Sequence, residues 1–220
     1  MMKKGKTLFF GLLCCLLLAV AAEASLTYLP ESSHYSGKSY YNVDVGGGKI
    51  ISGRIEFAVY DTQQYPSEFA GYTAPGEGRY IYAYQIINYN TNDYGMTNAA
   101  AAYFAIEDIG LGAILSTANI GTADGPGSGD IDATDEYFNP DLTRGIFEFD
   151  GGILVPGNDS WFLLLRSHKD YKTGTYSFAP PTNDDDVPVP DKDGENPIPE
   201  PTSTALLLTG IFCILKRKTS

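Results

Sequence analysis

Residues 80–89 read Tyr80-Ile81-Tyr82-Ala83-Tyr84-Gln85-Ile86-Ile87-Asn88-Tyr89. In this stretch one set of side chains recurs at every second position: Tyr80, Tyr82, Tyr84 and Ile86. The residues between them, Ile81, Ala83, Gln85 and Ile87, fall on the opposite face. A period of two in aromatic and β-branched residues is typical of a strand. The stretch therefore predicts a β-strand.

Similar short segments lie on both sides of it. In Arg54–Tyr60, three apolar residues (Ile55, Phe57 and Val59) share one face, and Arg54, Glu56 and Tyr60 share the other. Further strand candidates are Tyr103–Ile106, Gly145–Phe149 and Trp161–Arg166. Because Trp161–Leu165 is apolar on both faces, we expect it to lie in the middle of a sheet.

Glycine and proline separate these segments. Breakers occur at Gly46–Gly48, Pro75–Gly78 and Gly125–Gly129. Ile153–Ser160 reads as a short strand and a turn, and Asn98–Ala102 as a helical turn. Seven or eight short strands with turns between them predict a mainly β domain, an antiparallel β-sandwich spanning residues 25–178.

Charge and cysteine usage narrow the function classes. The chain of 220 residues carries a formal net charge of −12. Between Ser25 and Pro201, nine basic against 26 acidic residues give −17. This acidity argues against a nucleic-acid partner, which requires a basic surface. The three cysteines are Cys14, Cys15 and Cys213, so the predicted sandwich contains no thiol for a disulfide, a nucleophile or a metal site.

The N-terminal residues have the pattern of a secretory signal peptide. Lys3, Lys4 and Lys6 precede an apolar run over 8–22, and Ala22-Glu23-Ala24 stands before Ser25. We expect residues 1–24 to direct export through the Sec translocon and to be cleaved after Ala24. The alternative is a membrane anchor, but the run is shorter than the roughly 20 apolar residues that span a bilayer.

The C-terminal residues carry a second ordered pattern. Residues 179–198 are rich in proline and aspartate and predict an extended, solvated linker. Pro199-Glu200-Pro201 follows, then an apolar run over 202–215, and then Lys216-Arg217-Lys218. Proline fixes its own φ and keeps its predecessor out of the helical region, so the motif is extended and accessible to a processing enzyme.

The order Pro-Glu-Pro, apolar helix and basic tail over residues 199–220 resembles the PEP-CTERM sorting signal. The resemblance implies an exported bacterial protein that a membrane-embedded exosortase recognises at Pro199, Glu200 and Pro201. It also implies a transient inner-membrane anchor, with Lys216, Arg217 and Lys218 as the cytoplasmic membrane stop. The expected final location is the cell surface or the extracellular matrix, with exopolysaccharide as a further expected partner.

Residues 50–178 are similar to an ectodomain that recurs on PEP-CTERM proteins, which implies a sandwich and no assigned chemistry. The expected role is therefore non-enzymatic, structural or adhesive, and without a cofactor or catalytic residues. One alternative is a carbohydrate-binding module with Tyr80, Tyr82 and Tyr84 as a sugar-stacking face, although such a ladder also suits a buried sandwich face. A second alternative is a secreted polysaccharide-active enzyme using paired carboxylates.

One acidic loop is a candidate for Ca²⁺. It contains Asp130, Asp132, Asp135 and Glu136 among glycines. Oxygen-rich flexible loops can bind Ca²⁺, but Asp135 stands where an EF-hand loop needs its turn glycine. A solvated acidic loop without metal is the alternative interpretation. His34 and His168 are the two histidines, and no Gly-x-Ser-x-Gly motif accompanies them.

Overall fold

A computed structural model describes residues 26–178 and 184–190. These residues belong to one unit of the chain, Leu26–Pro197. The signal-cleavage residues Ala22, Ala24 and Ser25, the sorting motif and the basic tail lie outside the described residues. Among the residues that are described, no helix is both long and apolar enough to cross a bilayer.

The first sheet is formed mainly by long strands from the first half of the chain. Its order is β1-β2-β3-β9-β6, and all neighbours on this path are antiparallel. The short β4 joins β2 in parallel. The strands are β1 (Tyr35–Gly46), β2 (Lys49–Asp61), β3 (Tyr80–Asn88), β4 (Thr97–Asn98), β6 (Ile120–Ala123) and β9 (Phe162–Ser167).

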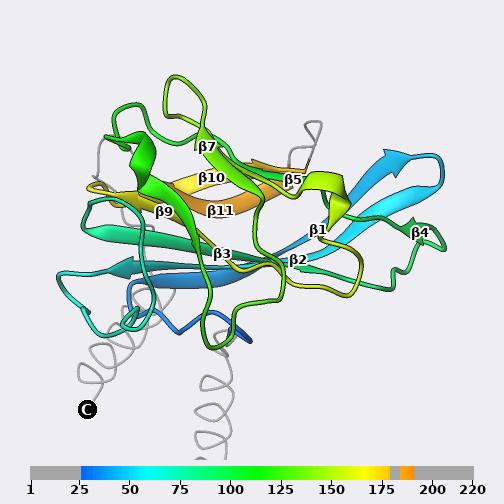
Figure 1. The fold of residues 1–220 in the computed structure, drawn as a ribbon, viewed down its shortest axis with the longest axis horizontal. Coiled ribbons are helices and arrows are strands. Elements are labelled where there is room, and N and C mark those ends of the chain that lie inside the picture. Colours follow the sequence, from blue (N-terminus) through cyan, green and yellow to red (C-terminus); the bar gives the residue numbers. More distant parts are fainter. Residues whose placement is uncertain (1–25, 179–183, 191–220) are drawn as a thin grey trace, which may run out of the picture. The chain divides into compact units, whose positions relative to one another are not determined.

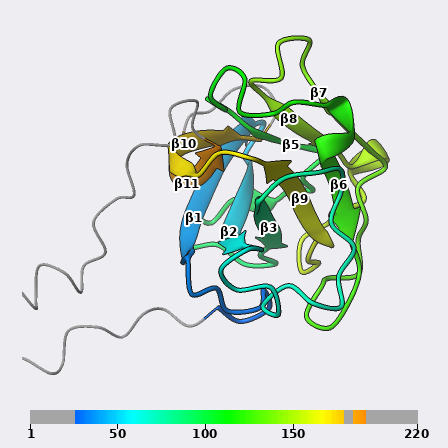
Figure 2. The same ribbon diagram turned by 90° about the vertical axis from the view of Figure 1, so that its left-hand side faces the viewer.

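The second sheet has the order β11-β10-β5-β8-β7 and is antiparallel throughout. It consists of β5 (Tyr103–Ile106), β7 (Asp135–Phe138), β8 (Gly145–Glu148), β10 (Tyr171–Ser177) and β11 (Asp184–Pro190). Two 3-10 turns, η1 (Thr117–Asn119) and η2 (Asp150–Gly152), lie in the connections. The two sheets face each other (Figures 1 and 2). The fold is therefore mainly β and sandwich-like, as the sequence predicted, but the described residues form eleven strands rather than seven or eight.

The main core fills the space between the sheets. The β3 side chains Tyr80, Tyr82, Tyr84 and Ile86 point into it, together with Phe104 and Phe147 of the second sheet. Tyr41 and Phe178 also meet here, with ring centroids 4.3 Å apart. A core of this size, rich in aromatic rings, buries enough apolar area to hold a domain without disulfides.

The first sheet is covered on its other face as well. A second cluster contains Leu26 and Leu29 from the N-terminal segment, Phe69 from the β2–β3 connection, and Phe162 and Leu164 from β9. Leu163 and Leu165 belong to the main core. The prediction that Trp161–Leu165 forms an inner strand is therefore confirmed, since β9 pairs with both β3 and β6.

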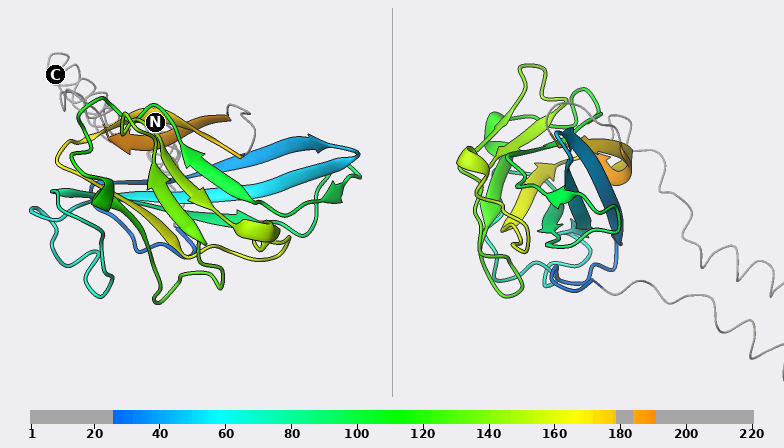
Figure 3. Two further views of the ribbon diagram at one scale, coloured as in Figure 1. Left: turned by 45° about the horizontal axis from the view of Figure 1, so that its top comes forward. Right: turned by 90° about the vertical axis from the view of Figure 1, so that its right-hand side faces the viewer.

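The β1–β2 hairpin extends beyond the rest of its sheet, with β4 near its far end (Figure 3). Its tip is Gly46-Gly47-Gly48, with φ angles of +82°, +64° and +72°. These angles lie in the left-handed region, where glycine has no Cβ to clash. The three glycines therefore permit the tight reversal that aligns β1 with β2.

Three local predictions are wrong. Ile153–Ser160 contains the expected turn but no strand, only isolated β-bridges at Leu154, Asp159 and Ser160. Asn98–Ala102 is not a helical turn, because Asn98 belongs to β4, and Ala99 and Ala101 donate their N–H groups to Ile50 and Leu154. The predicted linker over 179–198 contains β11, whose backbone pairs with β10 from Tyr171↔Pro190 to Tyr176↔Asp184. Proline fits an edge strand because its missing N–H can face away from the neighbour.

The pairing of β11 gives a test of where the domain ends. A chain covering 25–178 lacks β11, whereas a chain covering 25–197 keeps it. Ladder hydrogen bonds contribute about 1 kcal/mol each, so we expect the shorter chain to lose at least ~2 kcal/mol of unfolding free energy in urea titrations. Equal stability of the two chains would place the domain boundary at Phe178 after all.

Candidate functional site

The tyrosines proposed as a sugar-stacking face are buried. Tyr82 and Tyr84 are fully buried, and Tyr80 is 6% exposed. They lie against the second sheet, and the Tyr82 hydroxyl donates to the backbone oxygen of Lys169 at 2.9 Å. A sugar cannot reach their ring faces, so this stacking prediction is wrong and the buried-face interpretation is confirmed.

The acidic loop does not bring its carboxylates together as a ligand set. Within the described part of the chain, no group of three or more His, Cys, Asp or Glu side chains is placed to hold a metal ion. Asp135 and Glu136 are neighbours on β7, where successive side chains point to opposite faces. Burial, together with the charges of Asp132 and Asp135, raises the pKa of the Glu136 carboxyl.

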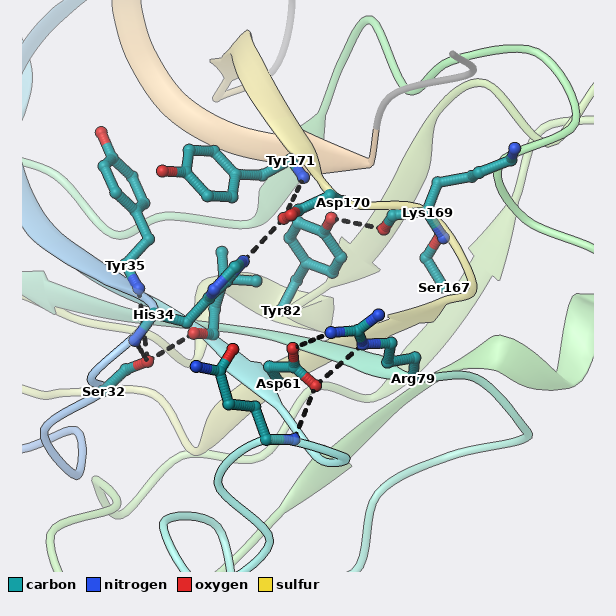
Figure 4. Close-up of polar contacts among 12 residues, drawn as sticks. Ser32, His34, Tyr35, Asp61, Arg79, Tyr82, Ser167, Lys169, Asp170 and Tyr171 are labelled. Atoms are coloured by element: carbon teal, nitrogen blue, oxygen red, sulfur yellow. Dashed lines mark hydrogen bonds and ion pairs between the residues drawn. The ribbon is translucent and has the colours of Figure 1, made fainter. Parts of the chain in front are cut away.

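A histidine–carboxylate pair joins the two sheets at one end (Figure 4). His34 Nε2 lies 2.7 Å from the Asp170 carboxylate, just before β10 begins. The ring stacks on Tyr80 with centroids 5.4 Å apart and meets the edge of Tyr171. The residues before β1 are thereby tied to β3 and β10.

This pair differs from a catalytic triad in what surrounds the imidazole. A triad places a hydroxyl nucleophile on the nitrogen that does not contact the carboxylate. The nearby Ser32 hydroxyl instead donates to the Val59 carbonyl and accepts the N–H of His34 and of Tyr35. The arrangement is one that fixes segments in place.

An ion pair close by fixes the connection between β2 and β3 (Figure 4). Arg79 Nε donates to Asp61 Oδ1 at 2.9 Å, and the guanidinium also contacts Oδ2. Asp61 further accepts the N–H groups of Gln63 and Gln64. The hydrogen bond from Arg79 is the main reason that the pKa of the Asp61 carboxyl is lowered to about 2.

Glu56, in the middle of β2, is a second fully buried carboxylate besides Asp61. It accepts N–H groups from Thr27 at 2.9 Å and from Tyr28 at 3.0 Å. Lys38 Nζ and Arg54 Nη2 lie 3.3 and 3.1 Å from its Oε1. Burial alone would raise the pKa of this carboxyl, but the backbone donors and Lys38 outweigh it, so the pKa is lowered.

Glu56 thus clamps the N-terminal segment onto the outer face of the first sheet. The Tyr60 hydroxyl adds a second attachment by donating to the Pro30 carbonyl at 2.6 Å. The chain positions involved, 27–30, begin three residues after the expected cleavage at Ala24. The sequence pattern placed Glu56 on the face of β2 opposite Ile55, Phe57 and Val59. A charged residue in the middle of a strand was the sequence feature from which this attachment could have been predicted.

Comparisons with family models, curated proteins and solved structures found no match for this chain.

The Glu56 clamp predicts a local and a global effect of substitution. Glu56→Ala leaves Lys38 and Arg54 without their buried partner, and breaking such a pair costs about 3–5 kcal/mol. Glu56→Gln keeps the size and one acceptor oxygen, and we expect a smaller loss in urea unfolding. Hydrogen exchange at the amides of Thr27 and Tyr28 should rise in both variants. Unchanged exchange at these two amides would contradict the clamp.

The lowered pKa of Asp61 predicts acid sensitivity with a definite sign. The fold favours the carboxylate form, so this contribution to stability is complete above the ordinary aspartate pKa of about 4 and is lost as the pH falls towards 2. Urea unfolding of the wild type from pH 5 to pH 2 should therefore show a steeper fall than that of Asp61→Asn. The control variant Asp44→Asn, changed at an exposed position of the hairpin, should keep the wild-type fall. Parallel curves for the wild type and Asp61→Asn would refute this role.

Proposed function

We propose that this chain is a non-enzymatic exported protein, sorted by an exosortase and delivered to the cell surface or extracellular matrix. Its β-sandwich body would act there as a structural or adhesive module near exopolysaccharide. The observation that carries the proposal is the ordered sequence pattern over residues 199–220: Pro-Glu-Pro, an apolar run and a basic tail.

The positions at which the described fold begins and ends in the sequence support this proposal. The clamped segment begins at Thr27, just after the expected cleavage between Ala24 and Ser25. At the other end, β11 finishes at Pro190, nine positions before Pro199. Cleavage at either position would leave every described strand intact, so the body can keep its fold after both processing steps.

The composition of the body supports the same location. The absence of cysteine from the residues between Ser25 and Pro201 makes the fold independent of redox state. Its net charge of −17 over those residues favours solubility and mutual repulsion of copies. Both properties suit a protein that works outside the cell as a separate unit.

The sorting motif is tested by replacing Pro199, Glu200 and Pro201 with alanines in a chain carrying a C-terminal epitope. The native chain should lose the epitope from its body during processing. The variant should retain it and accumulate as a membrane-bound precursor, measured by immunoblotting of membrane and extracellular fractions. A matched control replaces Pro188, Val189 and Pro190, upstream of the motif, and should be processed normally. Unchanged processing of the motif variant would reject the sorting proposal.

A further inference from the structure

Two exposed tyrosine rings flank one arginine on the outer face of the first sheet. Tyr40 of β1 is the direct cross-strand partner of Arg54 of β2, so both side chains point to the same face. Tyr40 is 64% exposed and Tyr28 is 37% exposed. The Arg54 guanidinium carbon lies 5.8 Å from the centroid of the Tyr28 ring. We name these three residues the Tyr40 face.

The Tyr40 face is held in place by the buried groups beneath it. Arg54 Nη2 lies 3.1 Å from the fully buried Glu56 carboxylate. The same carboxylate accepts the backbone N–H of Tyr28 at 3.0 Å, which fixes the chain that carries this ring. The register of β1 on β2 fixes the backbone position of Tyr40 and the face on which its ring lies. The face is therefore pre-organised, and a ligand would lose little free energy in ordering it.

A hydrogen-bond donor and a hydrogen-bond acceptor lie along the same cross-strand row of residues as Tyr40. Arg54 is paired with Ile87, and Ile87 forms a β-bridge with Asp159. Burial raises the pKa of the Asp159 carboxyl, the charge of Arg54 opposes that rise, and the charges of Asp130 and Glu56 add to it. The row supplies a guanidinium donor beside the rings, from Arg54, whose side chain is 18% exposed. Its carboxylate acceptor, Asp159, lies two positions further along the row.

We infer that the Tyr40 face binds a neutral polysaccharide. The C–H face of a sugar ring packs on a tyrosine ring, while its hydroxyls accept from the guanidinium and donate to a carboxylate. Near the face, the cations Arg54 and Lys38 stand against three carboxylates, Glu56, Asp159 and Asp130, which leaves a small negative excess. The strongly acidic body repels polyanions. An uncharged glycan is therefore the chemistry that fits.

This inference rests on the proposed function in one respect: the proposed function places the protein outside the cell, where it would encounter the glycan. It places sugar binding on a different face from the buried ladder of Tyr80, Tyr82 and Tyr84. Binding is measured on purified protein and sorting is measured in cells. Failure of one is therefore distinguishable from failure of the other.

The test is affinity electrophoresis of the full chain in native gels that contain laminarin, dextran or xyloglucan. The chain is kept in a polyoxyethylene detergent, which carries no sugar to compete. At least one of these neutral glycans should retard the wild type. Tyr40→Ala should weaken the apparent affinity about tenfold, because it removes a stacking surface. Tyr40→Phe keeps the ring and should bind like the wild type.

The control variant is Tyr137→Ala, which removes a partly exposed tyrosine of β7 in the other sheet. It should bind like the wild type. Three results would overturn the inference: no retardation by any of the three glycans, equal binding by Tyr40→Ala, or retardation by the acidic glycan alginate alone. Dimerisation in sedimentation that Tyr40→Ala abolishes, without any retardation, would instead assign the face to a second copy of this chain.

Discussion

Burial of β2, β3 and β9 on both faces is the constraint from which most of this structure follows. A strand covered on both sides has no solvent face for a polar side chain, so each polar group on it needs a partner. The Gln85 side-chain NH2 donates to the carbonyls of Gly127 and Ser160, and that of Asn88 to those of Ala99 and Leu154. Of these two amides, only the oxygens, Gln85 Oε1 and Asn88 Oδ1, are buried without a partner among the described residues. Glu56 fixes the N-terminal segment in the opposite sense, because its carboxylate accepts the N–H groups of Thr27 and Tyr28. The few polar residues in these strands thus decide where the surrounding loops lie.

The sequence predicted the strands in which apolar residues alternate with other residues or form an unbroken run. Alternation identified β2 and β3, and a fully apolar run identified β9. It missed β1, where serine, glycine, lysine and asparagine interrupt the pattern. It also took β11 for a linker, because aspartate and proline are typical of solvated segments, whereas a ladder of backbone hydrogen bonds needs no particular side chain.

For the candidate site, too, the sequence predicted the face of each strand but not the segments that cover it. Alternation placed Tyr80, Tyr82 and Tyr84 together on one face, but the second sheet that covers them comes from distant parts of the chain. The same holds for Glu56, whose role depends on a segment 28 and 29 positions earlier. A single sequence gives the face of a strand on which a residue lies. What covers that face is set by tertiary contacts. These contacts bury Tyr80, Tyr82 and Tyr84, and they bring Tyr28 and Tyr40 close to Arg54.

The pairing of β3 with β9 and of His34 with Asp170 also bears on how the chain is made. Tyr82 and Lys169 are 87 positions apart, and His34 and Asp170 are 136 apart. Synthesis proceeds from the N-terminus, so β1, β2 and β3 emerge long before the strands that cover them. Contacts over such distances form slowly, since a long loop must close first. The sandwich therefore cannot close before its last strands have been made, and until then the chain lacks its complete core.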